Sequence, residues 1–309
     1  MTKTLSIVAA VLVLVGGGLV VAAVSGAFDG DDGPRGAPPT REETAATETA
    51  AAALKVDRFD ARRAFKDLRH QVDMGPRPTG SEKARELADW LKERLPRGRI
   101  EALPGGLQNV VGRIPGRGKA IVVAAHYDTK DIPGFVGAND GAGGTAAVLE
   151  IARALRGKWP RSAPPIRFVL FDGEESPDDS KPFYSSGLRG SRPYAAEHAG
   201  DLRAMILLDF VAEKGLRIPR EAGSDPGLWR RLRAAAREVG AGVAFPAGTV
   251  GEVLDDHTPF TRRGVPAIDL IDFTFDCWHR ACDDMDVVSA RSLDLSGESV
   301  VQMLLDFRK

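Results

Sequence analysis

Short apolar runs alternate with amphipathic helical patterns along most of this chain, and this alternation limits the possible folds. Apolar runs of strand length are typical of a sheet that is buried on both faces, and the helices between them connect parallel strands. We expect strands at residues 109–114, 120–125, 166–171, 204–208 and 267–271, and helices at residues 58–72, 81–95, 144–156, 189–198, 225–239 and 292–307. The sequence therefore predicts an α/β fold in which a mostly parallel twisted central sheet is flanked by helices on both faces.

The beginning of the chain differs from the rest. Residues 4–28 carry no charge, Lys3 precedes them, and three aspartates follow within residues 29–32. This run is long enough to span a bilayer, and the position of the lysine favours an orientation with the rest of the chain outside the cytoplasm. We expect residues 1–28 to be a signal anchor in the cell membrane; the small residues near its end leave a cleaved signal peptide and a secreted protein as the alternative.

Residues 29–56 are rich in Ala, Thr, Glu, Gly and Pro and lack apolar periodicity, which predicts a disordered linker. We expect the remaining segment, 57–309, to form one domain of the size of an enzyme. With 43% apolar and 28% charged residues, the chain can bury a large core. The net charge of −1 provides no basic excess for neutralising phosphates, so we expect no nucleic acid partner.

Six side chains of metal-binding type lie where an expected strand gives way to a loop. They are His126, Asp140, Glu174, Glu175, Asp209 and His279. Open α/β sheets bind ligands at the carboxyl edge of their strands, and imidazole with carboxylate suits a metal such as zinc. The sequence therefore predicts a metal site at this edge.

The neighbours of these residues indicate how they act. Asp128 follows His126 by two positions, where a carboxylate can accept a hydrogen bond from the second ring nitrogen and fix the tautomer that binds metal. A histidine at a strand end can also be an ordinary polar group. Asp140 lies in a glycine-rich bend before an expected helix, so an N-terminal helix cap is the alternative to a metal ligand.

Three further carboxylates require a partner. Glu174 and Glu175 are adjacent and would repel each other unless one binds a metal and the other holds a proton. Asp209 closes the apolar run MILL, where an unpaired buried carboxylate would be costly. Each of these positions therefore predicts a metal ion or a bound proton.

From about Gly75 to the C-terminus, the chain resembles the M28 family of zinc enzymes. The resemblance rests on a set of short motifs in a fixed order: GPRPTGS, HYD, FVGAND, DGEE, DDHTPFTRRGVP, WH and DD. This family includes di-zinc aminopeptidases and single-zinc glutaminyl-peptide cyclotransferases. HYDTK, FVGAND and DDHTPFTRRGVPAIDLI are more similar to the cyclase branch. The resemblance implies an enzyme that acts on the N-termini of peptides or proteins, with glutaminyl cyclisation preferred and aminopeptidase activity as the alternative. A metal-free binding protein on the same scaffold is a third possibility.

The resemblance also implies a role for each site residue. In the cyclase branch one zinc ion is bound by Asp140, Glu175 and His279, and Glu174 is the general base and acid. In the aminopeptidase branch two zinc ions are present, Asp140 bridges them, and His126 and Asp209 complete the second metal site. The family also implies a cis peptide bond after Asp140.

Further cyclase features match less completely. Asp209 and Asp255 match hydrogen-bonding active-site acids, although Asp256 is adjacent and the choice between the two rests on the alignment alone. Trp278 matches an aromatic wall of the substrate pocket. Residues 176–191 contain no tryptophan where animal cyclases have one, and Leu254 replaces a glutamine, so these two differences concern substrate recognition.

The two cysteines of the chain, Cys277 and Cys282, bracket His279. In an oxidising compartment they predict a disulfide. A zinc site made by both cysteines and the histidine is the alternative. Asp283 and Asp284, which follow directly, are expected to orient this loop.

Overall fold

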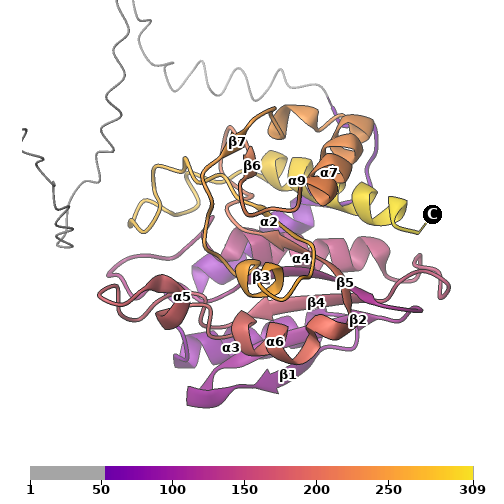
Figure 1. Ribbon diagram of the computed structural model, residues 1–309. Helices are drawn as coiled ribbons and strands as arrows, with labels where there is room; N and C mark the ends of the chain where they lie inside the picture. The colour runs from indigo at the N-terminus through magenta and orange to yellow at the C-terminus, as the bar shows by residue number, and fades with distance from the viewer. Residues whose placement is uncertain (1–52, 309) are drawn as a thin grey trace, which may run out of the picture.

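The centre of the structure is a six-stranded sheet with the strand order β1-β2-β4-β3-β5-β8 (Figure 1). The strands are β1 (Arg99–Ala102), β2 (Gln108–Ile114), β3 (Ala120–His126), β4 (Ile166–Phe171), β5 (Leu202–Leu208) and β8 (Ala267–Leu270). The computed structural model describes residues 53–308. The expected signal anchor and nearly all of the expected linker lie outside these residues. Within residues 53–308, no helix has the length and apolar character needed to cross a bilayer.

The sheet is mostly parallel, as predicted, and one of its strands runs against the others. Strands β4, β3, β5 and β8 run parallel, whereas β2 pairs antiparallel with both β1 and β4. A parallel crossover needs roughly a dozen residues or more, and the connections before and after β2 are shorter than that. The chain must therefore reverse direction at each end of β2. Within this six-stranded sheet, β2 is therefore the exception, and the other five strands share one direction.

Helices cover both faces of the sheet, as predicted. The long helices are α2 (Ala61–Asp73), α3 (Glu82–Arg94), α4 (Ala142–Leu155), α6 (Ser191–His198), α7 (Pro226–Val239) and α9 (Ala290–Asp306). Alternate residues of β3 face opposite layers: Ile121 and Val123 pack in the core of α2, α3, α4, α7 and α9, while Val122 and Ala124 pack with α6 and α8 (Thr258–Thr261). Figure 1 shows α4 and α9 on one side of the sheet and α6 on the other.

Each expected helix is present within a few residues of its predicted bounds. The sequence did not indicate β1, the four-residue helices α5 (Phe183–Ser186) and α8, or the small parallel sheet of β6 (Arg220–Glu221) and β7 (Thr249–Val250). These elements are too short to show a periodic pattern. Ordered contacts begin shortly before the expected domain boundary, because Leu54 and Val56 pack against the core and Lys55 N–H donates to Val239 O at 2.9 Å.

Close packing at the start of α4 positions the carboxyl edge of the sheet. A Cβ on Gly144 would lie 2.0 Å from the carbonyl oxygen of Leu208, so only glycine allows the helix to approach β5 this closely. The hydroxyl of Thr145 donates to the carbonyl oxygen of His126 at 2.8 Å and joins the same turn to β3. The bend that precedes this helix therefore brings Asp140 to the ends of both strands.

Candidate metal centre

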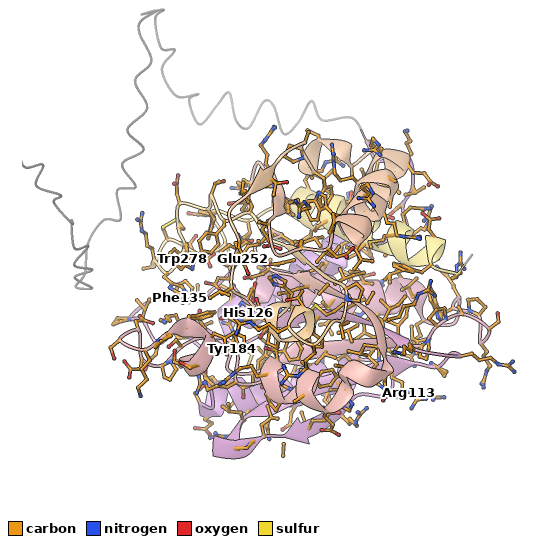
Figure 2. All side chains as sticks on the ribbon, in the orientation of Figure 1. Arg113, His126, Phe135, Tyr184, Glu252 and Trp278 are labelled. Atoms are coloured by element: carbon orange, nitrogen blue, oxygen red, sulfur yellow. A yellow bond between two sulfur atoms is a disulfide. The ribbon has the colours of Figure 1, made fainter. Side chains whose placement is uncertain are left out.

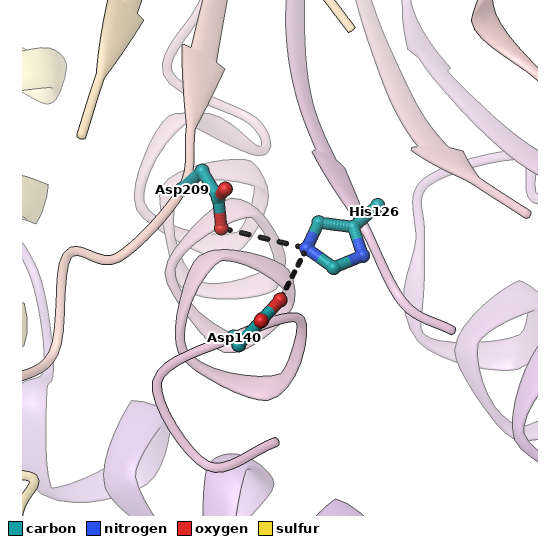
Figure 3. Close-up of side chains that lie close together, drawn as sticks. All are labelled: His126, Asp140 and Asp209. Carbon is teal, nitrogen blue, oxygen red and sulfur yellow. Dashed lines mark ion pairs between the residues drawn. The ribbon is translucent and has the colours of Figure 1, made fainter. Parts of the chain in front are cut away.

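The first group of metal-binding atoms surrounds His126, the last residue of β3. Its Nε2 lies 3.1 Å from Asp140 Oδ1 and 3.4 Å from Asp209 Oδ1 (Figure 3). Asp209 follows β5, the parallel neighbour of β3, so both strands deliver their side chains to the same edge. All three residues are buried.

The second group surrounds His279. Its Nε2 lies 3.2 Å from Glu175 Oε1 and 3.7 Å from Asp140 Oδ2. Glu175 comes from the loop after β4, and His279 comes from a loop far along the chain. In each group the donor atoms lie within 4.8 Å of one another. Asp140 belongs to both groups and presents one oxygen to each imidazole.

The atoms of the two groups need a cation. Both ring nitrogens of His126, Oδ2 of Asp140 and Oε1 of Glu175 are buried and have no hydrogen-bond partner. Leaving such atoms unpaired costs free energy. A metal ion in the first group would satisfy Nε2 of His126, and one in the second group would satisfy Asp140 Oδ2 and Glu175 Oε1, while Nδ1 of His126 faces Asp128. The residues present therefore fit a metal ion with nitrogen and oxygen ligands at either group.

Asp140 is free to act as a ligand because it does not cap α4. The N-cap position is Gly141, and no side chain there makes a capping hydrogen bond. The predicted cis bond after Asp140 is wrong: residues 53–308 contain no cis peptide. Gly141 makes the bend instead, with φ +96° and ψ −56°, a conformation that glycine adopts without steric cost.

Asp128 contacts both His126 and the loop that carries Glu174 and Glu175. Its Oδ1 lies 3.5 Å from His126 Nδ1, so the carboxylate is where the sequence predicted it, although the expected hydrogen bond to the ring is not formed. Its carboxylate also accepts hydrogen bonds from the hydroxyl of Thr79 at 2.5 Å and from the backbone N–H groups of Glu174 and Glu175, each at 3.3 Å. One carboxylate thus orients the imidazole and the loop that carries the glutamate pair.

The surroundings of Glu174 favour its protonated form. Burial, and then the negative charge of Glu175, raises the pKa of Glu174 well above its usual value. Burial and the charge of Asp140 also raise the pKa of Glu175, against the opposing effect of His279. Glu174 has no place in either donor group, so the pair divides into a residue beside the metal position and a residue that can hold a proton.

Burial and charge compete at His126 and Asp209. Burial lowers the pKa of His126, but the carboxylates of Asp128, Asp140 and Asp209 outweigh it and raise the pKa well above its usual value. Burial raises the pKa of Asp209 to about 7, even though His126 acts in the opposite direction. The surroundings therefore favour the protonated form of both side chains.

Asp255 rather than Asp256 lines the pocket beside Glu174 and Asp209. The sequence analysis missed a second buried polar group directly behind it. Nε2 of His257 lies 3.5 Å from Glu221 Oε1, and its Nδ1 lies 3.7 Å from Asp269 Oδ2. The sequence feature that could have indicated this group is Asp269, a carboxylate inside the otherwise apolar strand β8.

A pocket of about 680 Å³ opens onto the two groups. Its wall includes Trp278, whose ring stacks on that of His279 with 4.6 Å between centroids, and Leu254. In Figure 2, Trp278, Glu252 and His126 are labelled in the left half of the molecule and Arg113 in the right half. The remaining lining residues are Lys130, Asp140, Glu174, Glu175, Asp179, Phe183, Asp209, Phe210, Pro219, Val250, Gly251, Glu252, Val253, Asp255, Ile271, Phe273, Thr274 and His279.

Lys130 is a pocket residue that the sequence analysis also missed. Its ammonium group lies 3.8 Å from Glu175 Oε2, pairs with Asp179 at 2.5 Å and donates to the carbonyl oxygen of Ser176 at 2.9 Å. The sequence feature that could have indicated Lys130 as a pocket residue is its position shortly after His126 in the motif AAHYDTK. Lys130 therefore joins the glutamate pair to the segment that follows it.

The two cysteines form a disulfide with an S–S distance of 2.04 Å, as one prediction stated. The alternative, a metal site made by Cys277, His279 and Cys282, is wrong because each sulfur is bonded to the other. The disulfide closes the loop that carries Trp278 and His279.

Fold and site together define an α/β protein with a pocket at the carboxyl edge of its sheet, lined by side chains that could hold a metal ion. The chain belongs to peptidase family M28, whose model matches residues 109–304. This result confirms the family that the sequence motifs indicated.

Individual relatives represent both branches of the resemblance. A glutaminyl-peptide cyclotransferase of Bos taurus is 29% identical over 239 residues, which are 64% of this chain and 66% of that protein. The chain thus spans just under two thirds of this relative's length. The crystal structure of an Acidobacteriales bacterium glutaminyl cyclase matches with 30% identity and a TM-score of 0.71, covering 84% of this chain and 98% of that one. A leucine aminopeptidase precursor from Bacteroides thetaiotaomicron matches with 25% identity and a TM-score of 0.73, covering 82% and 99%.

Proposed function

We propose that this chain is a zinc-dependent glutaminyl-peptide cyclotransferase, which converts the N-terminal glutamine of a peptide or protein to pyroglutamate and releases ammonia. The observation that carries the proposal is the position of Glu174. It is a buried carboxyl with a raised pKa, and it lines the pocket next to the donors Asp140, Glu175 and His279. The glutaminyl-peptide cyclotransferase of Bos taurus and the Acidobacteriales bacterium glutaminyl cyclase support the same activity.

The proposed zinc ligands are Asp140, Glu175 and His279. Zinc bonds of about 2.0–2.1 Å in a tetrahedral site place neighbouring donor atoms roughly 3.3 Å apart. The separation of 3.2 Å between His279 Nε2 and Glu175 Oε1 agrees with that spacing. When bound, zinc would polarise the side-chain amide carbonyl of the substrate glutamine.

Proton transfer is the task of Glu174 in this proposal. The α-amine of the substrate attacks the amide carbon of its own side chain, so one C–N bond forms and the bond to the departing nitrogen breaks. Glu174 accepts the proton that the amine loses and gives it to the departing ammonia. A raised pKa suits both steps. The carboxylate is a stronger base toward the amine, and the carboxyl that results can still donate its proton to the more basic departing nitrogen.

The proposed roles of Asp209 and Asp255 follow from their position beside Glu174. All three line the pocket, and the charge of Asp255 adds to the rise in the pKa of Glu174. With a pKa of about 7, Asp209 can share a proton within this set. These acids would keep Glu174 ready for transfer, and Trp278 would pack against the methylene groups of the glutamine.

A di-zinc aminopeptidase is the second candidate function, and one observation favours it. His126, Asp140 and Asp209 form a second donor group that shares Asp140 with the first. In that reaction Glu174 would take a proton from water instead of an amine. The leucine aminopeptidase precursor among the structural relatives agrees with this candidate.

Metal analysis combined with two assays separates the candidates. After dialysis, we expect one zinc per chain and ammonia release from a Gln-initiated peptide, with none from the N-acetylated peptide, whose amine is blocked. Two zinc ions, both required for amino-acid release from Leu- and Ala-initiated peptides, would establish the aminopeptidase. Protein without metal and without either activity would refute both.

We further propose that residues 1–28 tether the enzyme to the cell membrane with residues 57–309 outside the cytoplasm. The support is the uncharged run preceded by Lys3 and followed by acids. A reporter that is active only outside the cytoplasm, fused after Lys309, should show activity. An active cytoplasmic reporter at the same position would exclude this topology.

A further inference from the structure

The backbone of His279 adopts a conformation that its own side chain disfavours. Its φ is +51°, in the left-handed region where the Cβ of a non-glycine residue approaches the backbone. Such a conformation persists only where the surrounding structure imposes it. The source of that constraint is therefore part of the metal site.

One constraint is the disulfide at the base of the loop. Cys277 and Cys282 are five positions apart, and His279 lies inside the ring that they close. Within this segment, Arg280 N–H donates to the carbonyl oxygen of Cys277, and Asp283 N–H donates to that of Arg280, both at 3.0 Å. The covalent bond limits the conformations in which the loop can present the imidazole.

The second constraint is the carboxylate of Asp283, which is fully buried. Its Oδ1 accepts a hydrogen bond from Asn139 N–H at 2.7 Å, and its Oδ2 accepts one from Asp140 N–H at 3.0 Å. Its carbonyl oxygen accepts a third bond, from Ala138 N–H at 3.2 Å. Asp283 therefore ties the loop of His279 directly to the residue that carries the shared metal-binding carboxylate.

Arg77 fixes the opposite side of the Asp140 loop. Its fully buried guanidinium donates to the carbonyl oxygens of Val136 at 2.9 Å and Gly75 at 2.8 Å. The loop before Asp140 is therefore anchored to the body of the protein, and Asp283 adds the loop of His279 to that anchor.

We propose that Asp283 and the Cys277–Cys282 disulfide are positioning elements that set His279 and Asp140 in place before the metal binds. Without them, metal binding would have to order the loop and impose the strained backbone of His279, which lowers affinity. The inference rests on the proposed metal site and is independent of the reaction catalysed there.

Metal affinity, measured by competition with a chromogenic chelator, tests this arrangement. Asp283→Asn keeps the shape but replaces one accepting oxygen by an amide NH₂, and a Cys277→Ser/Cys282→Ser double variant removes the covalent closure. Each should bind zinc about 10- to 100-fold more weakly than the wild-type chain. The disulfide sits at a partly exposed loop, so the double variant should fold even if the Asp283 variant does not.

Two control variants lie in the same segment. Asp284→Asn changes a neighbouring carboxylate that accepts from Asp286 N–H and makes no hydrogen bond to the Asp140 loop. Ala281→Ser changes an exposed position inside the disulfide ring. Both should bind zinc with an affinity within about twofold of the wild type, and thermal unfolding of the metal-free proteins reports whether each variant is folded.

The outcomes separate two failures. A wild-type chain that binds no zinc would refute the proposed metal site. A wild-type chain that binds zinc, with a folded double variant that binds it equally well, would overturn the positioning role of the disulfide. A folded Asp283→Asn variant that binds zinc as tightly as the wild-type chain would overturn the positioning role of Asp283.

Discussion

Oδ1 of Asp140 lies 3.1 Å from Nε2 of His126, and the second oxygen of that carboxylate faces His279. Asp140 therefore serves both donor groups, whereas His126 serves one. If the single zinc lies between Asp140, Glu175 and His279, Asp140→Ala should abolish tight zinc binding and His126→Ala should retain one equivalent. Elemental analysis after dialysis measures both. Loss of zinc from the His126 variant would contradict this placement.

The adjacent glutamates should respond differently to the same substitution. Glu174→Gln removes the proton carrier but keeps its shape, so zinc should remain bound while turnover falls by about 10²- to 10⁴-fold. Glu175→Gln should weaken zinc binding itself. Ammonia release and metal content, measured on the same samples, report both effects. Zinc loss from the Glu174 variant alone would show that the roles are reversed.

Metal affinity should fall as the pH falls. Metal binding requires unprotonated donors. Burial lowers the pKa of His279, but the hydrogen bond and charge of Glu175 outweigh burial and raise it. Burial raises the pKa of Glu175. Protons that remain bound must leave before zinc enters, so affinity decreases about tenfold per pH unit for each proton displaced. Competition titrations between about pH 8 and about pH 6 test the sign. Affinity that is constant or rises on acidification would contradict it.

The contact between α4 and β5 should tolerate no added methyl group. Gly144→Ala would place a Cβ 2.0 Å from a backbone carbonyl oxygen, which cannot rotate away. We expect a loss of about 3 kcal/mol in the free energy of unfolding, measured in urea. Gly200→Ala is the matched control, because no atom lies within 4 Å of its added Cβ. Equal stability of the two variants would disprove the close approach.

The rim of the pocket should select the substrate residue that follows the N-terminus. Among the residues that the structure describes, Val250, Leu254, Phe273 and Trp278 are exposed large apolar side chains that line the pocket, and Phe273 and Trp278 are in ring contact. Phe273→Ser should lower kcat/KM about 10-fold for peptides with an aromatic second residue and much less for peptides with glycine there. Val243→Ser, exposed but outside the pocket lining, is the control. An equal loss for both kinds of peptide would argue against this subsite.

The strands and the chemistry at their ends followed from local sequence. The runs that end at His126 and before Asp209 are continuous and apolar because both faces of those strands are buried. A polar residue directly after such a run must lie at the carboxyl edge. Spacing along the chain was therefore sufficient to place these residues at one edge of the sheet.

Only the tertiary structure decided which of these residues meet. Asp140 faces both imidazoles, and Asp283 bonds to the backbone of Asp140, although His279 and Asp283 lie far along the chain from it. The antiparallel direction of β2 and the choice of Asp255 over Asp256 as the pocket residue were likewise settled by packing. The physical reason is that local patterns record burial and chain direction within one segment, whereas contacts between distant loops depend on how all the segments pack together.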